Sequence, residues 1–151
     1  FTAVAAAALP EREAHAQVFA VGEILLDAMM ASDALHWLPL YARWEAGLLE
    51  ALGFGLDLSE CAATGGTDEL VYVSPRSGRA VSRGGVAEDA ERRRKLPCCL
   101  LASQNHRDAR AIRDGLSLTG DFLAERVFKP NGREMPAARL RLDALAARES
   151  D

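Results

Sequence analysis

The amino-acid sequence predicts a mainly α-helical domain, a helical bundle interrupted by one small β-hairpin. Two observations lead to this fold class. Apolar residues recur every three or four positions in several long segments, which is the spacing of one helix face. Between Glu69 and Ser82 the pattern changes to alternation, which is typical of paired strands. With 151 residues, the chain is long enough for one domain with a hydrophobic core.

The first helix is expected to start at Pro10–Glu11–Arg12–Glu13, because proline and acidic residues are favoured in a first helical turn. The segment from Ala14 to Met30 then carries apolar residues at helical spacing. The expected buried stripe consists of Val18, Val21, Leu25 and Met29.

The clearest pattern in the sequence is a second helix from about Ala34 to Leu52. Its apolar stripe is broad, so we expect a central helix that is contacted on several sides. Pro39 should lie early in this helix or at a break, and Gly53 and Gly55 supply its C-terminal stop. The stripe consists of Trp37, Leu38, Tyr41, Trp44, Leu48, Leu49 and Leu52.

The hairpin follows this helix. Two strand-like pieces, 69–73 and 79–82, flank a turn at Ser74–Pro75–Arg76–Ser77–Gly78. A two-stranded ribbon is marginal by itself, so it needs packing or a metal ion to hold it.

Three further helices are expected in the C-terminal half. The segment Ala87 to Ser103 has a basic start and is broken by Pro97. Arg107 to Phe128 has strong helical spacing, and Pro136 opens a last helix. The last helix carries Leu140, Leu142 and Leu145.

Composition limits the classes of protein. No apolar run reaches membrane-span length, which predicts a soluble protein. Three cysteines, two of them adjacent, do not form a disulfide framework and fit a reducing compartment. Residue 1 is Phe rather than Met, so we expect the sequence to be part of a longer chain.

Charge is distributed unevenly along the sequence. Residues 1–75 carry 2 basic and 11 acidic side chains, whereas residues 76–151 carry 16 basic and 11 acidic ones. The densest basic part contains Arg76, Arg79, Arg83, Arg92, Arg93, Arg94 and Lys95. Such a patch indicates a local anionic partner or, as composition alone favours, charges that only face water. No aromatic residue lies among the run 92–95 to stack bases.

The sequence contains no recognisable motif for a catalytic, metal-binding or phosphate-binding site. A structural zinc site needs four Cys or His ligands, usually in close pairs, but Cys61 has Thr64 at the CxxC position. The matching positions across the hairpin hold Ser82 and Gly85. The three histidines are scattered, and Gly65–Gly66 lacks the rest of a phosphate-binding loop.

Several motifs in collinear order resemble the RecO family of bacterial DNA repair proteins. They are Tyr41–Glu45, Leu48–Leu49, Leu52–Leu58, Cys61, Tyr72–Ser82, Leu118–Gly120, Phe122–Leu123 and Met135–Arg139. The resemblance implies an N-terminal OB-fold followed by a helical domain with a zinc-ribbon-like insertion. Residues 1–151 would be the helical domain and 59–86 the insertion, reduced to Cys61 in a hairpin lacking its metal ligands. The OB-fold would be absent.

The resemblance further implies a recombination mediator that is not an enzyme and has no cofactor. Such proteins bind single- and double-stranded DNA, anneal complementary strands and act with RecR in loading the recombinase. They also bind the acidic C-terminal tail of the single-stranded DNA-binding protein on the helical domain. The implied location is the cytoplasm, in association with the nucleoid and not with a membrane.

The implied partner site on this sequence consists of Arg43, Trp44, Phe19 and Leu25. For Arg43, a surface ion pair with Glu50 or another acid is an equally good interpretation. The seven basic residues between 76 and 95 are the candidates for DNA contact, expected to be weak and independent of base sequence. An alternative of another class is a helical protein–protein interaction domain with no direct role on DNA.

Overall fold

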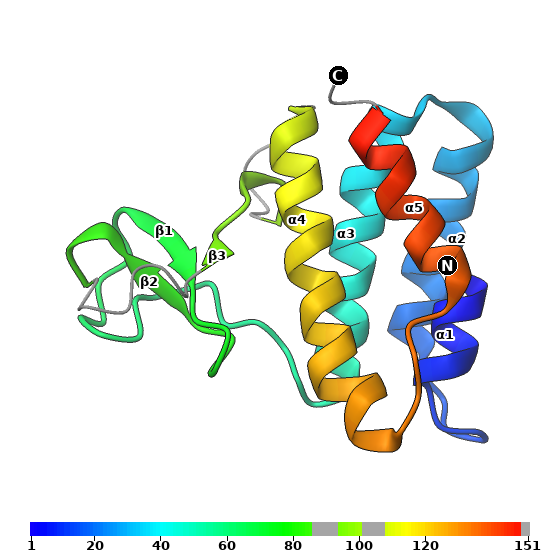
Figure 1. Ribbon diagram of the computed structural model, residues 1–151, viewed down its shortest axis with the longest axis horizontal. Helices are drawn as coiled ribbons and strands as arrows, with labels where there is room; N and C mark the ends of the chain where they lie inside the picture. The colour runs from blue at the N-terminus through cyan, green and yellow to red at the C-terminus, as the bar shows by residue number, and fades with distance from the viewer. Residues whose placement is uncertain (86–93, 101–107, 149–151) are drawn as a thin grey trace.

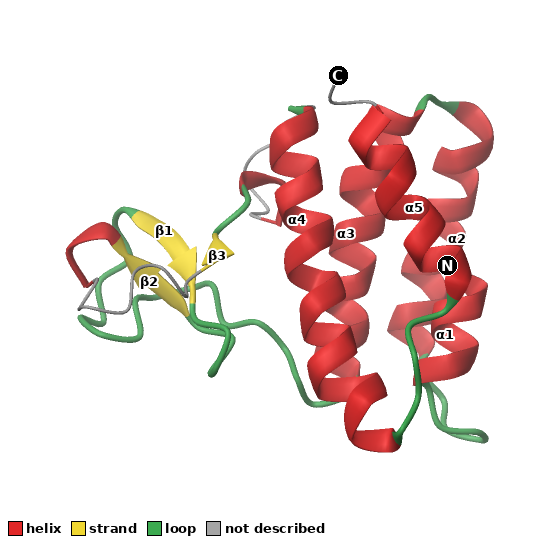
Figure 2. Cartoon of the chain, viewed as in Figure 1, coloured by secondary structure: helices red, strands yellow, loops and turns green. Residues whose placement is uncertain are grey.

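The computed structural model describes residues 1–85, 94–100 and 108–148. Long helices lie side by side in one bundle, and a small sheet stands to one side of it (Figure 1). Figure 2 shows the same division between the helical part and the strands. The helices are α1 (Thr2–Ala8), α2 (Ala16–Ala31), α3 (Ala34–Ala51), α4 (Ala109–Phe122) and α5 (Ala137–Arg148). The mainly helical fold class predicted from the sequence is confirmed.

Helix α3 is the centre of the bundle and packs against both α2 and α4. Asp33 caps its start by accepting a hydrogen bond from the His36 amide at 3.1 Å. Pro39 lies early in the helix, which continues through it. The predicted apolar stripe is confirmed except for Leu52, which follows the helix and is only partly buried. The buried apolar residues of α3 are Trp37, Leu38, Pro39, Tyr41, Ala42, Trp44, Leu48 and Leu49.

The N-terminal region differs from the prediction in two respects. Residues 2–8 form α1, whose Val4 is buried, and this helix was not predicted. Alanine, which fills most of the segment, is the residue with the highest helix propensity. Helix α2 begins at Ala16 instead of at Pro10, which precedes a turn. Within α2, Val18 and Leu25 are buried as expected, but Val21 and Met29 are 38% and 36% exposed. The buried face of α2 therefore includes fewer of its apolar residues than the sequence pattern predicts.

The sheet has three antiparallel strands in the order β2-β1-β3. Strands β1 (Leu70–Val73) and β2 (Ala80–Ser82) form the predicted hairpin, with Tyr72 opposite Val81 and Val73 opposite Ala80. The third strand, β3 (Arg94–Lys95), was not expected. It pairs with the free edge of β1, because an edge strand presents unpaired backbone groups.

The helix predicted over 87–103 is wrong for the residues that are described. Residues 94–95 are the strand β3, and 98–100 form a short 3₁₀ turn, η3 (Cys98–Leu100). Pro97 lies between them and has no amide hydrogen to continue a helix. Residues 87–93 and 101–103 lie outside the described part of the chain.

The helix predicted from Arg107 to Phe128 is confirmed as α4 followed by a π-helical segment, η4 (Leu123–Phe128). A short 3₁₀ turn, η5 (Lys129–Asn131), follows and ends at Gly132, which has φ 63°. In α5 the predicted Leu140 is 58% exposed, and Arg139 is buried instead. None of the helices in the described ranges is long and apolar enough to cross a membrane.

Candidate functional site

A groove runs between α2 and α3, and we call it the α2–α3 groove. It encloses about 350 Å³. Its lining residues are Gln17, Val18, Val21, Arg43, Trp44, Gly47, Glu50 and Ala51. Four of these side chains are apolar, and one amide, one cation and one carboxylate lie among them. A pocket that is mainly apolar with a few polar groups is the usual form of a small binding site.

Trp44 is a fixed wall of this groove. Its side chain is 1% exposed, and its indole Nε1 donates a hydrogen bond to the Val18 carbonyl oxygen at 3.1 Å. The ring of Phe1 meets it edge-on, with 5.3 Å between the ring centroids. Because both α2 and the N-terminus hold the indole, it cannot turn outward to a partner without a change in the fold.

Arg43 lines the groove, and its side chain also forms a hydrogen bond outside it. Its Nε donates to the carbonyl oxygen of the buried Cys99 at 2.7 Å. The described residues show no ion pair between Arg43 and Glu50, although both line the groove. The interpretation of Arg43 as the ion-pair partner of Glu50 is therefore not supported.

The other two predicted partner residues behave differently from each other. Phe19 is 70% exposed and lines a neighbouring cavity of about 220 Å³, whose wall also includes Val18 and Trp44. Leu25 is 1% exposed and belongs to the hydrophobic core. Because α2 turns Leu25 inward against the bundle, it has no surface to offer a partner.

The predicted cationic residues are partly neutralised by acids that the fold brings to them. Arg79 forms ion pairs with Asp57 at 3.2 Å and Glu60 at 2.9 Å, and Arg94 forms one with Asp121. Arg76, Arg83, Arg94 and Lys95 are exposed. Arg92 and Arg93 lie outside the described residues.

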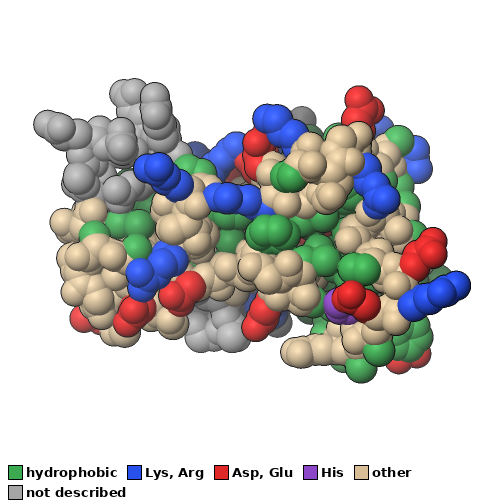
Figure 3. All heavy atoms as spheres, turned by 90° about the horizontal axis from the view of Figure 1, so that it is seen from below, with side chains coloured by type: hydrophobic (Ala, Val, Ile, Leu, Met, Phe, Trp, Pro, Cys, Tyr) green, Lys and Arg blue, Asp and Glu red, His purple; other side chains and the backbone are tan. Residues whose placement is uncertain are grey.

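Seen from below, the molecule carries basic and acidic side chains that are interspersed (Figure 3). Among the described residues drawn in this view, the Lys and Arg side chains do not form one continuous patch. A surface of this kind favours individual anion contacts over electrostatic coating.

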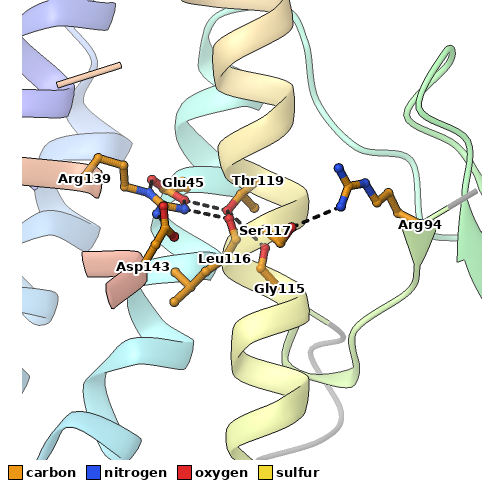
Figure 4. Close-up of polar contacts among 8 residues, drawn as sticks. All are labelled: Glu45, Arg94, Gly115, Leu116, Ser117, Thr119, Arg139 and Asp143. Carbon is orange, nitrogen blue, oxygen red and sulfur yellow. Dashed lines mark hydrogen bonds and ion pairs between the residues drawn. The ribbon is translucent and has the colours of Figure 1, made fainter. Parts of the chain in front are cut away.

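A buried ionic cluster, which the sequence analysis did not identify, joins three helices (Figure 4). The Arg139 guanidinium on α5 donates two hydrogen bonds to the Glu45 carboxylate on α3, from Nε to Oε1 at 2.5 Å and from Nη2 to Oε2 at 3.0 Å. Thr119 on α4 donates its hydroxyl to Glu45 Oε2 at 2.5 Å. All three residues are at most 2% exposed. A buried charge pair persists only when its remaining hydrogen-bonding capacity is also met, as it is here.

The rest of the cluster completes the bonding of Arg139. Its Nη2 also donates to the Leu116 carbonyl oxygen at 2.6 Å, and its Nη1 pairs with Asp143. Burial by itself would lower the pKa of Arg139, but the neighbouring Glu45 carboxylate raises it, so the guanidinium stays charged. Burial also raises the pKa of Tyr41, and the negative charge of Glu45 acts in the same direction.

Three of the motifs quoted for the family resemblance meet in this cluster. Glu45 belongs to Tyr41–Glu45, Thr119 to Leu118–Gly120, and Arg139 ends Met135–Arg139. These motifs therefore hold α3, α4 and α5 together. In the sequence, Glu45 stands out only as a charged residue on an otherwise apolar helix face. Only the fold shows that it pairs with Arg139.

Cys61 lies in the hairpin region, and its thiol is 1% exposed. Its sulfur accepts hydrogen bonds from the Ser82 amide at 3.2 Å and the Ser82 hydroxyl at 3.3 Å. These bonds lower the pKa of the thiol to about 6, the hydroxyl contributing most. No group of three or more potential metal ligands occurs in the described ranges.

Comparison of the sequence with known proteins identifies the family of the chain. The model of the C-terminal part of recombination protein O matches residues 1–134. The chain is 51% identical over 145 residues to a DNA repair protein RecO of Caulobacter vibrioides (strain NA1000 / CB15N), covering 95% of this chain and 59% of that protein. It is 49% identical over 142 residues to a RecO protein of Cereibacter sphaeroides (strain KD131 / KCTC 12085), covering 93% and 57%.

A third relative, a DNA repair protein RecO of Acidiphilium cryptum (strain JF-5), is 47% identical over 151 residues, covering 97% of this chain and 59% of the relative. The chain belongs to the RecO family. It spans less than two thirds of the length of these relatives. No solved structure matches the chain.

Proposed function

We propose that the chain is part of a DNA repair and recombination mediator. In this proposal it binds DNA and the C-terminal tail of the single-stranded DNA-binding protein, and it assists strand annealing and recombinase loading together with RecR. Membership of the RecO family, whose relatives are named DNA repair proteins, supports the general role. The α2–α3 groove supports the part that concerns the tail.

The single observation that carries tail docking is the composition of this groove. The family resemblance implies a tail that is acidic and ends in Phe. Such a peptide needs an apolar slot for the ring and a cation for its carboxylates, which must be compensated when they leave water. Val18, Val21 and Trp44 supply apolar walls, and Arg43 supplies a guanidinium beside them. The bond from Arg43 Nε to Cys99 fixes the direction of that side chain in advance.

Calorimetric titration of a nine-residue tail peptide into the domain tests this proposal. We expect binding in the micromolar range, weakened by about 1–3 kcal/mol in Arg43→Ala, as for a charge-assisted contact. Arg83→Ala is the matched control, because Arg83 is exposed and does not line the groove. Thermal unfolding of each variant checks that the lost Cys99 contact has not altered the fold.

A second variant tests the sign of the electrostatic effect. Glu50 lines the groove and would repel the carboxylates of the peptide, so Glu50→Gln should tighten binding. Moving the terminal Phe of the peptide to its first position should abolish binding at unchanged charge. Absence of binding by the folded wild-type domain would remove tail docking from the proposal.

A protein–protein interaction domain without a role on DNA is the second candidate, and one observation favours it. Helix α2 exposes large apolar residues, among them Phe19 at 70%, Ile24 at 62% and Met30 at 88%. Exposed apolar patches commonly mark protein interfaces. Fluorescence anisotropy with single-stranded DNA over a salt series separates the candidates, because a mediator should bind with an affinity that falls steeply as salt increases.

A further inference from the structure

A small cavity lies where three distant segments meet at the foot of the hairpin, and we call it the Phe54 pocket. It encloses about 170 Å³. Its lining residues are Gly53, Phe54, Gly55, Arg76, Ser77, Phe122 and Arg126. They come from the end of α3, the hairpin turn, and the junction of α4 with η4. None of the described residues that line this pocket is a carboxylate, although the whole chain is acidic.

Phe54 is held at the pocket by the C-terminal turn of α3. Gly53 has φ 82°, a conformation that favours glycine, and the Phe54 amide donates to the Leu49 carbonyl oxygen at 2.8 Å. This is the hydrogen bond of a Schellman cap, in which the residue after the glycine usually packs its side chain against the helix. Phe54 is nevertheless 41% exposed, so part of its ring is available.

Arg126 and Arg76 bring positive charge to the same pocket. Arg126 Nη2 donates to the carbonyl oxygens of Arg76 and Pro75, at 2.5 and 3.4 Å, and so ties η4 to the hairpin turn. The Arg76 side chain is exposed and forms no ion pair with the residues that the structure describes. Two guanidinium groups and an aromatic ring therefore share a pocket whose lining carries no negative side chain.

A second cavity, of about 220 Å³, adjoins the pocket and shares Phe122 and Arg126 with it. Two acids line that cavity, but Asp121 pairs with Arg94 and Glu125 pairs with Lys129. Two adjoining cavities at the junction of the hairpin and α4 suit an elongated polyanion better than an isolated anion. A base of double-stranded DNA is stacked and paired, so only a single strand can offer its base to the ring.

We infer that the Phe54 pocket binds one nucleotide of single-stranded DNA, with the base stacked on Phe54 and the adjacent phosphate contacted by Arg76 and Arg126. The inference rests on the proposed DNA-binding function and assigns a position to it. The site lies apart from the α2–α3 groove, because the two share no lining residue.

The test measures anisotropy of a labelled oligothymidylate with the 151-residue chain and its variants over a salt series. Phe54→Ala should weaken binding about tenfold without changing the salt dependence, since stacking is uncharged. Arg76→Ala should reduce the slope of log K against log salt by about 0.7, as expected for one lost phosphate contact on a single strand. Phe19→Ala and Arg148→Ala are the matched controls, an exposed aromatic and an exposed cation that do not line the pocket.

Three further measurements separate stacking from a change in fold. Phe54→Leu keeps an apolar side chain at the Schellman cap but has no ring, and it should bind the oligothymidylate as weakly as Phe54→Ala. An abasic oligonucleotide of equal length should bind wild type and Phe54→Ala equally. An oligonucleotide carrying 5-iodouracil should crosslink to Phe54 on irradiation.

The outcomes distinguish failure of the site from failure of the proposed function. Tight binding that is indifferent to Phe54→Ala, or an equal loss of affinity for the abasic strand, overturns the site and leaves DNA binding intact. Absence of oligonucleotide binding by the wild-type chain overturns both. If the tail peptide, and not the oligonucleotide, crosslinks at Phe54, the pocket belongs to a protein partner and the inference is wrong.

Discussion

At the scale of single residues, Gly120 shows how a glycine inside a helix serves a packing contact. A Cβ atom at this position would lie 2.9 Å from Nη2 of Arg139, which is bonded to Glu45 and Leu116. The guanidinium therefore reaches its partners across α4 because position 120 has no side chain.

The first prediction follows from this close approach. Gly120→Ala should destabilise the fold by about 1–3 kcal/mol, because a well-bonded guanidinium must shift to admit the methyl group. Gly47→Ala is the matched control: it also lies in a helix, and its Cβ would meet nothing within 4 Å. That change should stabilise the chain by about 0.5–1 kcal/mol. Urea unfolding of both variants measures the difference, and equal effects would contradict the packing argument.

The second prediction concerns the ionisation of Cys61. The folded state has a thiol pKa of about 6, against 9.0 for an ordinary cysteine, because Ser82 donates to the sulfur. Between these values the unfolded chain still holds a proton that the folded chain has released, so the free energy of unfolding should rise with pH from 6 to 9. Below pH 6 both states hold the proton, and this dependence disappears.

Ultraviolet absorbance of the thiolate measures this ionisation directly, in a Cys98→Ser background. Burial raises the pKa of Cys99 to about 12, so Cys99 does not interfere below pH 9. Ser82→Ala should move the Cys61 midpoint upward, since the largest contribution comes from the Ser82 hydroxyl. A midpoint that stays in place would show that this hydrogen bond does not control the thiol.

At the scale of elements, the hairpin shows how a short sheet is held without ligand pairs for a metal. Val73 and Ala80 are fully buried, and a third strand covers the edge of β1. Asp57 adds two backbone contacts: its amide donates to the Gly78 carbonyl at 3.1 Å, and its carbonyl accepts from the Ala80 amide at 2.8 Å. Packing and pairing therefore supply the support that a two-stranded ribbon lacks.

The third prediction concerns the link between hairpin and bundle. Arg126→Ala removes the donor that ties η4 to the carbonyl oxygens of Pro75 and Arg76. The hairpin turn should then open more often, and the Gly78 amide, bonded to Ser74 at 2.8 Å, should exchange its hydrogen faster. Lys129→Ala is the control, because it breaks only an exposed pair with Glu125. Unchanged exchange at Gly78 in Arg126→Ala would show that the turn is held by the sheet alone.

At the scale of the whole molecule, the cluster of Glu45, Thr119 and Arg139 determines how the helices meet. In helix α5 the buried residues are Arg139 and Ala146, and Leu142 and Leu145 pack partly buried against the core. The Arg139 contact therefore adds a specific polar attachment to a modest apolar one. Residues 45 and 139 are 94 positions apart, so their pairing fixes the return of the C-terminal helix to the centre of the bundle.

The fourth prediction follows from the energetics of a buried pair. Arg139→Met alone should destabilise the fold by about 3–5 kcal/mol, because it leaves the Glu45 carboxylate buried without its partner. Glu45→Leu together with Arg139→Met should cost much less than the sum of the two single changes, since no charge is then left alone. Urea unfolding of the four forms makes a double-mutant cycle. Additive effects would mean that the pair does not couple α3 to α5.

The sequence by itself determined the class of the fold and the positions of its main elements. Helical spacing in 34–52 and 107–128 gave α3 and α4, and alternation around residue 72 gave the hairpin. It also gave the family, which the comparisons confirmed. Of the candidate partner site, it placed Arg43 and Trp44 on one helix, and both line the groove.

Only the tertiary structure decided which of these residues are available to a partner. Periodicity shows that a face is apolar but not whether a neighbour covers it. The sequence therefore places Leu25 both in the buried stripe and in the partner site, and the structure leaves it only in the core. Val21 was expected in the same buried stripe, but it lines the groove. Charge content in turn does not show which acid lies beside which base. Glu45 and Arg139 pair, and Phe54 and Arg76 line one cavity, because packing brings distant segments of the chain together. A local sequence pattern does not contain that information.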